Sequence, residues 1–189
     1  MLRIYGDSQS GNCYKIKLLL YILSIEHEWI HVDILAGETH TDEFKKMNPN
    51  SRIPVLLLAN GSILTESNAI LNFLAEGSEY LPKDRYLRAQ VLQWQFFEQY
   101  SHEPFIATAR YINKYLGLPE DRRAEYEAKQ EGGHTALSVM EQQLSQSDFL
   151  VGSSLTIADI SLYAYTHVAH EGGFELDGYV AIRRWIDRI

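Results

Sequence analysis

The sequence is poor in cysteine and in long hydrophobic runs, and each deficit excludes a class of protein. A single cysteine, Cys13, among 189 residues rules out an internal disulfide and fits a reducing compartment better than a secreted one. No apolar stretch approaches the length of a transmembrane helix, and the first residues lack the basic start and long apolar run of a signal peptide. We therefore expect a cytoplasmic protein that contacts no membrane.

Positive charge is also scarce. Lysine and arginine together number 17 against 25 aspartate and glutamate residues, which gives a formal net charge of -8 at pH 7. Such a surface repels phosphate backbones over most of its area, so nucleic acid is not expected as a partner. Repeats and low-complexity tracts are absent too, and the 46% hydrophobic content is that of an ordinary folded protein.

The first 76 residues alternate between strand and helix signals. The predicted elements are a strand at Leu2–Gly6, a helix carrying Ile16, Leu19, Leu20 and Leu23, a strand at Glu28–Ile34, a short helix from Thr41 to Met47, strands at Pro54–Leu58 and Ser62–Leu64, and a helix from Glu66-Ser67 to Ala75. Asn60-Gly61 is a strong hairpin signal because both residues tolerate positive φ. The order βαβαββα is that of a thioredoxin-like domain.

Residues 77–84 are polar and contain Gly77 and Pro82, which indicates a linker. Strand signals then almost vanish, and apolar residues keep helical spacing over 85–189. The residues that do so are Leu87, Val91 and Trp94, then Tyr126, Gly133, Leu137, Met140 and Leu144, and finally Ile182, Trp185, Ile186 and Ile189. The second part is therefore predicted to be an all-α helical bundle.

One helix of this bundle has a marked start signal. Thr156 and Asp159 lie three residues apart, as in a capping box, and Leu155 and Ile160 flank them like a hydrophobic staple. The residues that follow are apolar on several sides, which is typical of a helix that runs through the middle of a bundle.

Taken together, the motifs resemble the cytosolic glutathione S-transferase superfamily over essentially the whole chain. They are Arg52-Ile53-Pro54 before the hairpin, Glu66-Ser67 at a helix start, Leu155-Thr156-Ile157-Ala158-Asp159 in the helical part, and Ser10-Gly11-Asn12-Cys13-Tyr14-Lys15. The last of these looks like the serine-type active-site turn of the theta- and zeta-like classes and their bacterial relatives. The resemblance implies a glutathione-binding domain at 1–76, a linker at 77–84 and an all-α domain at 85–189. It also implies an enzyme that transfers glutathione to an electrophilic small molecule.

Two residues near the first helix carry the implied catalysis. Ser10 precedes a helix N-terminus, where its hydroxyl and nearby N–H groups can converge on a sulfur anion. Residue statistics alone would favour a simple helix cap for Ser10, and only the resemblance argues for catalysis. Asn12 matches a position where some bacterial relatives direct an Asn at the glutathione sulfur. Tyr5 and Ser8 are reserve candidates.

The resemblance also implies a set of glutathione contacts. Ser67, at a helix start, resembles the residue that grips the γ-glutamyl carboxylate, and Glu66 is expected to accept the substrate's amino group. Pro54 matches the family's cis-proline, which would turn the Ile53 backbone outward to pair with the cysteinyl part like an added strand.

Arg52 and His40 resemble the side chains that contact the glycyl carboxylate. Lys or Gln is more usual than Arg at the Arg52 position, and a loop histidine such as His40 is often simply solvated.

Other reactive residues receive no role. Ser10 and Cys13 occupy the two cysteine positions of a thioredoxin C-x-x-C, so dithiol chemistry by the protein alone is excluded, and Cys13 is expected to be a buried hydrophobe. His167 and His170, three apart on a predicted helix and followed by Glu171, have a spacing compatible with metal ligation. Without a further His or Cys cluster we expect no metal.

Substrate choice and class stay open at this point. The aromatic residues Trp94, Phe96, Phe97, Tyr100, Phe105 and Tyr111 are candidates for an apolar pocket that takes the electrophile. Alternatives to conjugation are glutathione-dependent disulfide reduction, a non-catalytic interaction or stress protein, and a zeta-type isomerase, which ranks last because Gly11 and Asn12 replace that class's second serine and cysteine. The family usually forms homodimers, here expected through helices at 67–75 and 85–100.

Overall fold

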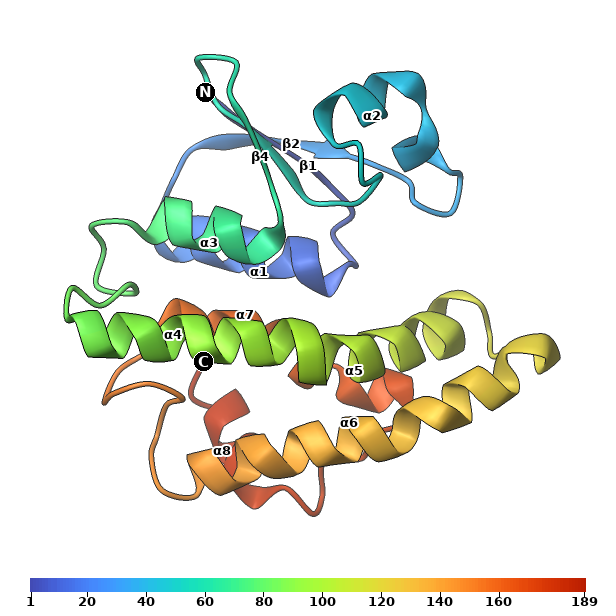
Figure 1. Ribbon diagram of the computed structural model, residues 1–189, viewed down its shortest axis with the longest axis vertical. Helices are drawn as coiled ribbons and strands as arrows, with labels where there is room; N and C mark the ends of the chain where they lie inside the picture. Colours follow the sequence, from blue (N-terminus) through green and yellow to red (C-terminus); the bar gives the residue numbers. More distant parts are fainter. The chain divides into compact units, whose positions relative to one another are not determined.

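The computed structural model describes all 189 residues, and contacts divide the chain into two compact units, Met1–Gly77 and Ser78–Ile189 (Figure 1). The first unit contains β1 (Leu2–Gly6), α1 (Gly11–Ile22), β2 (His27–His31), α2 (Asp42–Met47), β3 (Val55–Leu57), β4 (Ile63–Thr65) and α3 (Ser67–Ala75). This element order is the predicted thioredoxin-like one. The boundary between the units falls inside the predicted linker.

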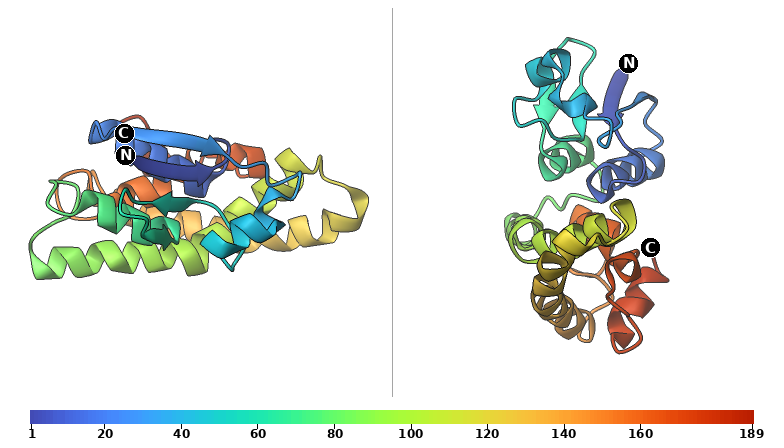
Figure 2. Two further views of the ribbon diagram at one scale, coloured as in Figure 1. Left: turned by 90° about the horizontal axis from the view of Figure 1, so that it is seen from above. Right: turned by 90° about the vertical axis from the view of Figure 1, so that its right-hand side faces the viewer.

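The strands form one sheet in the order β2-β1-β3-β4. β1 runs parallel to β2 (Figure 2) and antiparallel to β3, and β3 pairs antiparallel with β4. Because strand side chains alternate between faces, the paired residues Ile4 and Leu56, both fully buried, face one side of the sheet, where α1 and α3 lie side by side (Figure 1). Tyr5 and Val55 face the other side, toward α2.

The bounds of three strands differ from the prediction. The strand expected at Glu28–Ile34 is His27–His31, because β1 offers only five pairing positions, from Leu2 opposite His27 to Gly6 opposite His31. In the hairpin, Leu58 pairs its N–H with the carbonyl of Ser62 at 2.8 Å, which leaves Ser62 in the turn. The predicted strand Pro54–Leu58 therefore shortens to β3, and Ser62–Leu64 shifts by one residue to β4.

The second unit contains only helices: α4 (Arg85–Phe97), α5 (Glu103–Arg110), α6 (Arg123–Leu144), α7 (Ile157–Thr166) and α8 (Val180–Ile186). A π-helical turn at Glu98–His102 joins α4 to α5 as one long rod (Figure 1), and a second π turn at Tyr111–Tyr115 follows α5. None of the helices combines the length and the apolar character needed to cross a bilayer.

Helix α7 is the centre of this unit, as its apolar sequence predicts. Nine of its ten residues are buried, and it contacts α4 and α5. Its first residue also ties down the segment between the units' boundary and α4, because the Ile157 N–H donates to the Tyr80 carbonyl at 2.9 Å. Ile189, which was expected to continue the stripe of the last helix, lies beyond the end of α8 at Ile186.

Asp159 holds the start of α7 together. The predicted capping box is present: the Thr156 side chain accepts from the helix start, and the Asp159 carboxylate accepts from the Thr156 N–H at 3.0 Å and from its hydroxyl at 3.1 Å. The other carboxylate oxygen accepts from the Leu150 N–H at 2.8 Å and the Trp185 indole N–H at 3.0 Å. One fully buried side chain thus joins the loop before α7, α7 itself and α8.

This arrangement predicts a large cost for Asp159→Asn. Both carboxylate oxygens accept hydrogen bonds, so an amide NH₂ faces donors whichever way it is turned, and we expect a loss of about 3 kcal/mol of unfolding free energy. Urea unfolding followed by circular dichroism measures it. Asp177→Asn, an exposed change on a loose ion pair with Arg183, is the matched control and should cost less than about 0.5 kcal/mol. Equal midpoints for the two variants would contradict the role of Asp159.

Candidate functional site

Ser10 lies at the N-cap position of α1 with an extended backbone, at φ -69° and ψ 127°. A tight turn leads into it, because the Ser10 N–H donates to the Asp7 carbonyl at 3.1 Å. The Ser10 carbonyl accepts from the Tyr14 N–H at 2.8 Å, but its side chain makes no capping hydrogen bond to the helix. The Ser10 hydroxyl therefore does not act as a simple helix cap. It lies beside the first N–H groups of a 12-residue helix.

Cys13 is sealed beneath this turn. Its side chain is fully buried, and burial raises the pKa of its thiol to about 12, against the opposing effect of a hydrogen bond with the Ser10 side chain. The backbone of β1 passes very close, since a Cβ added at Gly6 would lie 2.7 Å from the Cys13 sulfur. The thiol is thus protonated and inaccessible at neutral pH. Position 6, at the end of β1, has no space for a side chain, which explains the glycine there.

The start of α3 has an unusual backbone. Glu66, at its N-cap position, has φ 66° and ψ 113°, a backbone conformation that residues other than glycine rarely adopt. Ser67, the first residue of the helix, is only 6% exposed. Its hydroxyl donates to the Asn12 side-chain oxygen over 3.0 Å. The N-termini of α1 and α3, 55 residues apart in the sequence, therefore converge.

The Ile53–Pro54 peptide bond is cis, as the resemblance predicts. Ile53 is half-buried and packs against a small core that Val32, Phe44 and Val55 form under α2. Asn48 fixes the chain just before it, because its side-chain N–H₂ donates to the Arg52 carbonyl at 2.7 Å. Asn48 is 5% exposed and was missed from sequence, where Asn48-Pro49 read only as the end of a helix.

The two remaining predicted contacts are less constrained. His40 ends a 3₁₀ turn at Glu38–His40, and both His40 and Arg52 are exposed. No hydrogen bond or ion pair joins either side chain to the other predicted residues. Of the reserve candidates, Tyr5 packs on the core under α2, whereas Ser8 is exposed.

The histidine pair does not share a helix, which corrects the prediction. α7 ends at Thr166, His167 stacks on the Tyr163 ring with centroids 4.5 Å apart, and His170 belongs to a separate 3₁₀ turn. Burial lowers the pKa of His167. Glu171 forms ion pairs with Arg110, at 2.6 Å, and with Lys114. No group of three or more His, Cys, Asp or Glu side chains has a metal-binding arrangement.

The predicted aromatic group is also divided. Trp94 is buried and meets Phe97 edge to face with ring centroids 5.2 Å apart, but Phe96 and Tyr100 are 60% and 81% exposed. Phe96 on α4 and Tyr100 in the π turn that follows lie on a different face of this rod from Trp94.

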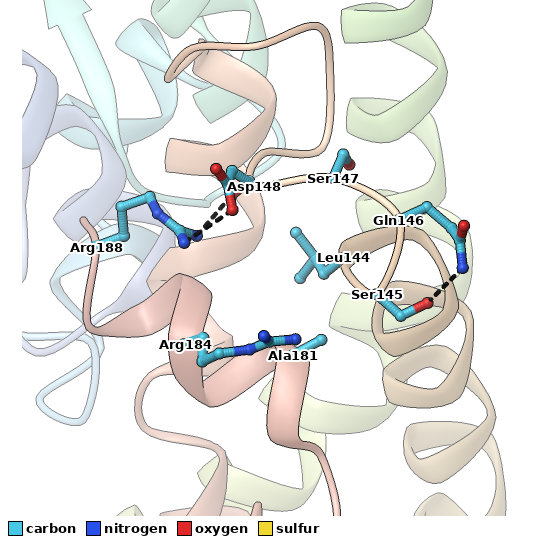
Figure 3. A pocket seen from close by; sticks show the side chains of 8 residues that line it. All are labelled: Leu144, Ser145, Gln146, Ser147, Asp148, Ala181, Arg184 and Arg188. Atoms are coloured by element: carbon cyan, nitrogen blue, oxygen red, sulfur yellow. Dashed lines mark hydrogen bonds and ion pairs between the residues drawn. The ribbon is translucent and has the colours of Figure 1, made fainter.

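A polar cavity of about 290 Å³ lies in the second unit, at the end of α6 (Figure 3). Leu144, Ser145 and Ala181 are among its lining residues, and Arg188 pairs with Asp148 at its edge over 2.9 Å. None of the predicted glutathione contacts lines it.

Comparison with known proteins identifies the chain. Residues 9–76 match the model of the glutathione S-transferase N-terminal domain, and residues 94–189 match that of the C-terminal domain. The chain belongs to the glutathione S-transferase family. By homology it is therefore a glutathione S-transferase, with the thioredoxin-like and all-helical parts that the sequence predicts.

Three relatives illustrate the family's range. A crystal structure of a glutathione S-transferase from Pseudomonas fluorescens Pf-5 is 60% identical, with a TM-score of 0.98, and the match covers 100% of this chain and 94% of that one. The glutathione transferase URE2P6 of Phanerochaete chrysosporium, solved with oxidized glutathione, is 27% identical with a TM-score of 0.88 over 99% and 89% of the chains. The disulfide-bond oxidoreductase YfcG of Escherichia coli K12 is 29% identical over 94% of this chain and 85% of that protein.

The environment of Cys13 predicts that its thiol is inert in this transferase. With a pKa near 12 in place of 9.0, the thiolate fraction at pH 8 falls about 1000-fold, so labelling by Ellman's reagent should be slower by at least that factor in the folded protein than in urea. Ser153→Cys, in an exposed loop and in a Cys13→Ala background, is the control and should react at an ordinary rate. Fast labelling of the native wild type would contradict the assignment.

Proposed function

We propose that this transferase binds glutathione on its first unit, holds the thiol as thiolate, and lets it attack an electrophilic small molecule. The observation that carries the proposal is the convergence of the α1 and α3 N-termini, fixed by the 3.0 Å hydrogen bond between Ser67 and Asn12. Each helix start offers the N–H groups of its first turn and the positive end of a helix dipole, so two anions can be held close together.

The two anions that the proposal assigns to these helix starts belong to one glutathione molecule. The thiolate lies at the start of α1, beside the Ser10 hydroxyl and the Asn12 amide. The γ-glutamyl carboxylate lies at the start of α3, on Ser67, with Glu66 accepting the neighbouring ammonium group. Ile53, before the cis bond, pairs its backbone with the cysteinyl part, and Arg52 and His40 reach the glycyl carboxylate.

Calorimetric titration with reduced glutathione, in two buffers of different ionisation enthalpy, tests the assignment of Ser10. A hydrogen bond to a charged group contributes about 1.5 to 3 kcal/mol, so Ser10→Ala should raise the pKa of the bound thiol by about one to two. We therefore expect proton release on binding by the wild type and much less by the variant. Ser8→Ala, in the same turn but exposed, should behave like wild type.

No binding of glutathione by the wild type would overturn the proposal and favour a non-catalytic interaction protein. Binding with equal proton release by Ser10→Ala would remove Ser10 from catalysis while leaving the glutathione site.

Disulfide reduction is a second candidate, supported by the similarity to YfcG. In this reaction one glutathione thiolate attacks a disulfide and a second glutathione resolves the mixed disulfide, which releases oxidised glutathione and two thiols. The buried Cys13 has no part in it. Rates with a model electrophile and with hydroxyethyl disulfide, measured on the same sample, separate conjugation from reduction.

We also propose that the protein forms a homodimer through α3 and α4. Leu92, Phe96 and Tyr100 recur every four residues on one face of the α4 rod and are 40%, 60% and 81% exposed, and Phe73 on α3 is 48% exposed. An exposed apolar stripe of this kind commonly marks a protein interface.

Phe96→Glu tests the dimer. A buried unpaired carboxylate is costly, so the variant should sediment as a monomer at concentrations where the wild type is dimeric. Val139→Glu, a change at a 41% exposed position on α6, is the matched control and should stay dimeric. A monomeric wild type, or an unchanged Phe96→Glu dimer, would refute this interface.

A further inference from the structure

The polar cavity at the end of α6 carries an uneven charge. Its charged lining residues are Arg184 and Arg188, with two positive charges, and Asp148, with one negative charge (Figure 3). Asp148 pairs with Arg188 at 2.9 Å, whereas Arg184 has no ion pair or hydrogen bond. The cavity therefore holds one guanidinium in excess, in a chain whose net charge is -8.

The backbone places both arginines on one side of the chain. Arg184 lies in the last turn of α8, and helical turns continue past the end of this helix, because the Arg188 N–H donates to the Trp185 carbonyl at 3.1 Å. Side chains four residues apart in such turns are neighbours. The preceding arginine, Arg183, pairs instead with Asp177 at 3.7 Å, outside the cavity lining.

The Arg188 guanidinium is held in place but keeps donors for a ligand. Its Nη1 donates to the Asp148 carbonyl at 3.0 Å, its Nη2 pairs with the Asp148 carboxylate, and its central carbon lies 5.8 Å from the centre of the Phe149 ring. A guanidinium has five N–H donors, so these contacts do not use all of them. Figure 3 shows the Arg184 side chain lying apart from this pair, along the cavity.

The end of α6 opposes an anion less than a helix C-terminus usually does. Such an end carries partial negative charge on its last, unpaired carbonyls. Here the Glu141 carbonyl accepts from the Ser145 N–H at 2.8 Å, and the Gln142 carbonyl accepts from the Ser145 hydroxyl at 2.7 Å. The Gln143 carbonyl accepts from the Gln146 N–H at 3.1 Å. Hydrogen bonds therefore satisfy most of these carbonyls.

The cavity also has an apolar part. Leu144 and Ala181 line it and are 5% and 3% exposed. A ligand that combines one oxyanion with a short hydrocarbon chain would meet both kinds of surface, and a volume of about 290 Å³ leaves room for it.

We propose that this cavity binds a small monocarboxylate with a short alkyl chain, whose carboxylate lies between Arg184 and Arg188 and whose chain packs on Leu144 and Ala181. One negative charge balances the guanidinium in excess, and the planar guanidinium matches a carboxylate in shape. The site uses none of the predicted glutathione contacts, so its test is independent of the proposed function.

Titration of the whole protein with sodium butyrate at pH 7, at constant ionic strength, tests the site by ¹H–¹⁵N NMR. We expect saturable binding with a dissociation constant on the order of a few mM, and shifts concentrated at residues 144–148 and 181–188. Acetate, which lacks two methylene groups, should bind about fivefold more weakly. Butyramide, which lacks the charge, should not bind.

Three variants at exposed positions locate the carboxylate. Arg184→Gln should weaken butyrate binding at least tenfold, because a charge-assisted pair is lost. Arg183→Gln, the matched control on the same helix, should bind like wild type. Asp148→Asn removes the opposing charge and keeps an acceptor for Arg188, so it should strengthen binding about threefold.

The proposal has several ways to fail. Absence of saturable binding by the wild type, or equal affinities of Arg184→Gln and Arg183→Gln, would overturn the site. Unchanged affinity in Asp148→Asn would place the anion outside the cavity. Inorganic phosphate and acetate that both bind as tightly as butyrate would show a general anion site and overturn the assigned ligand.

Discussion

The helical unit depends on one buried carboxylate. Asp159 is fully buried, and moving a charge out of water is expensive unless hydrogen bonds replace the lost hydration. Burial raises the pKa of this side chain, and hydrogen bonds from Leu150, Thr156 and Trp185 oppose that effect. Those same donors belong to the loop before α7, the start of α7 and α8. Satisfying one charge therefore fixes three segments that are otherwise separate in the chain.

The first unit brings two helix starts together at one place. The Ser10 side chain makes no capping hydrogen bond to α1, and Glu66, at the start of α3, has a strained backbone. Apolar packing on both faces of the sheet stabilises this arrangement. Ile4 and Leu56 are buried under α1 and α3, and a second small core lies under α2. A rigid, well-packed scaffold of this kind is what allows a site to be held ready before its ligand arrives.

Local patterns in the sequence predicted whatever depends on neighbours within one turn. The stripe of Leu19 and Leu20 predicted α1, and the spacing of Thr156 and Asp159 predicted the capping box, because capping acts over three residues. The lengths of β2 and β3 and the position of β4 were wrong because the partner strands decide them. The π turns were not predicted either, because no local sequence signal marks the insertion of one extra residue into a helical turn.

In the candidate site, too, what depends on tertiary contacts could not be predicted from local sequence patterns. The roles of the residues at positions 10, 12, 66 and 67 could be predicted only from the resemblance to a known family. The cis bond before Pro54 was predicted on that basis alone. The contact between Ser67 and Asn12 spans 55 residues, and the hydrogen bond of Asn48 to Arg52 depends on a turn that no propensity specifies. Side-chain direction at such points follows from tertiary packing, which a single sequence does not display.

The buried position of Cys13 determines what a second sulfur at position 10 would meet. Cys13 lies three residues after Ser10, with the Ser10 side chain hydrogen-bonded to its sulfur. Exchanging a single oxygen for sulfur at position 10 would recreate a vicinal dithiol, with an outer sulfur at the helix start and an inner one already buried beneath it. A Ser10→Cys exchange would therefore give this chain a thiol of its own at the place where it is proposed to hold the glutathione sulfur.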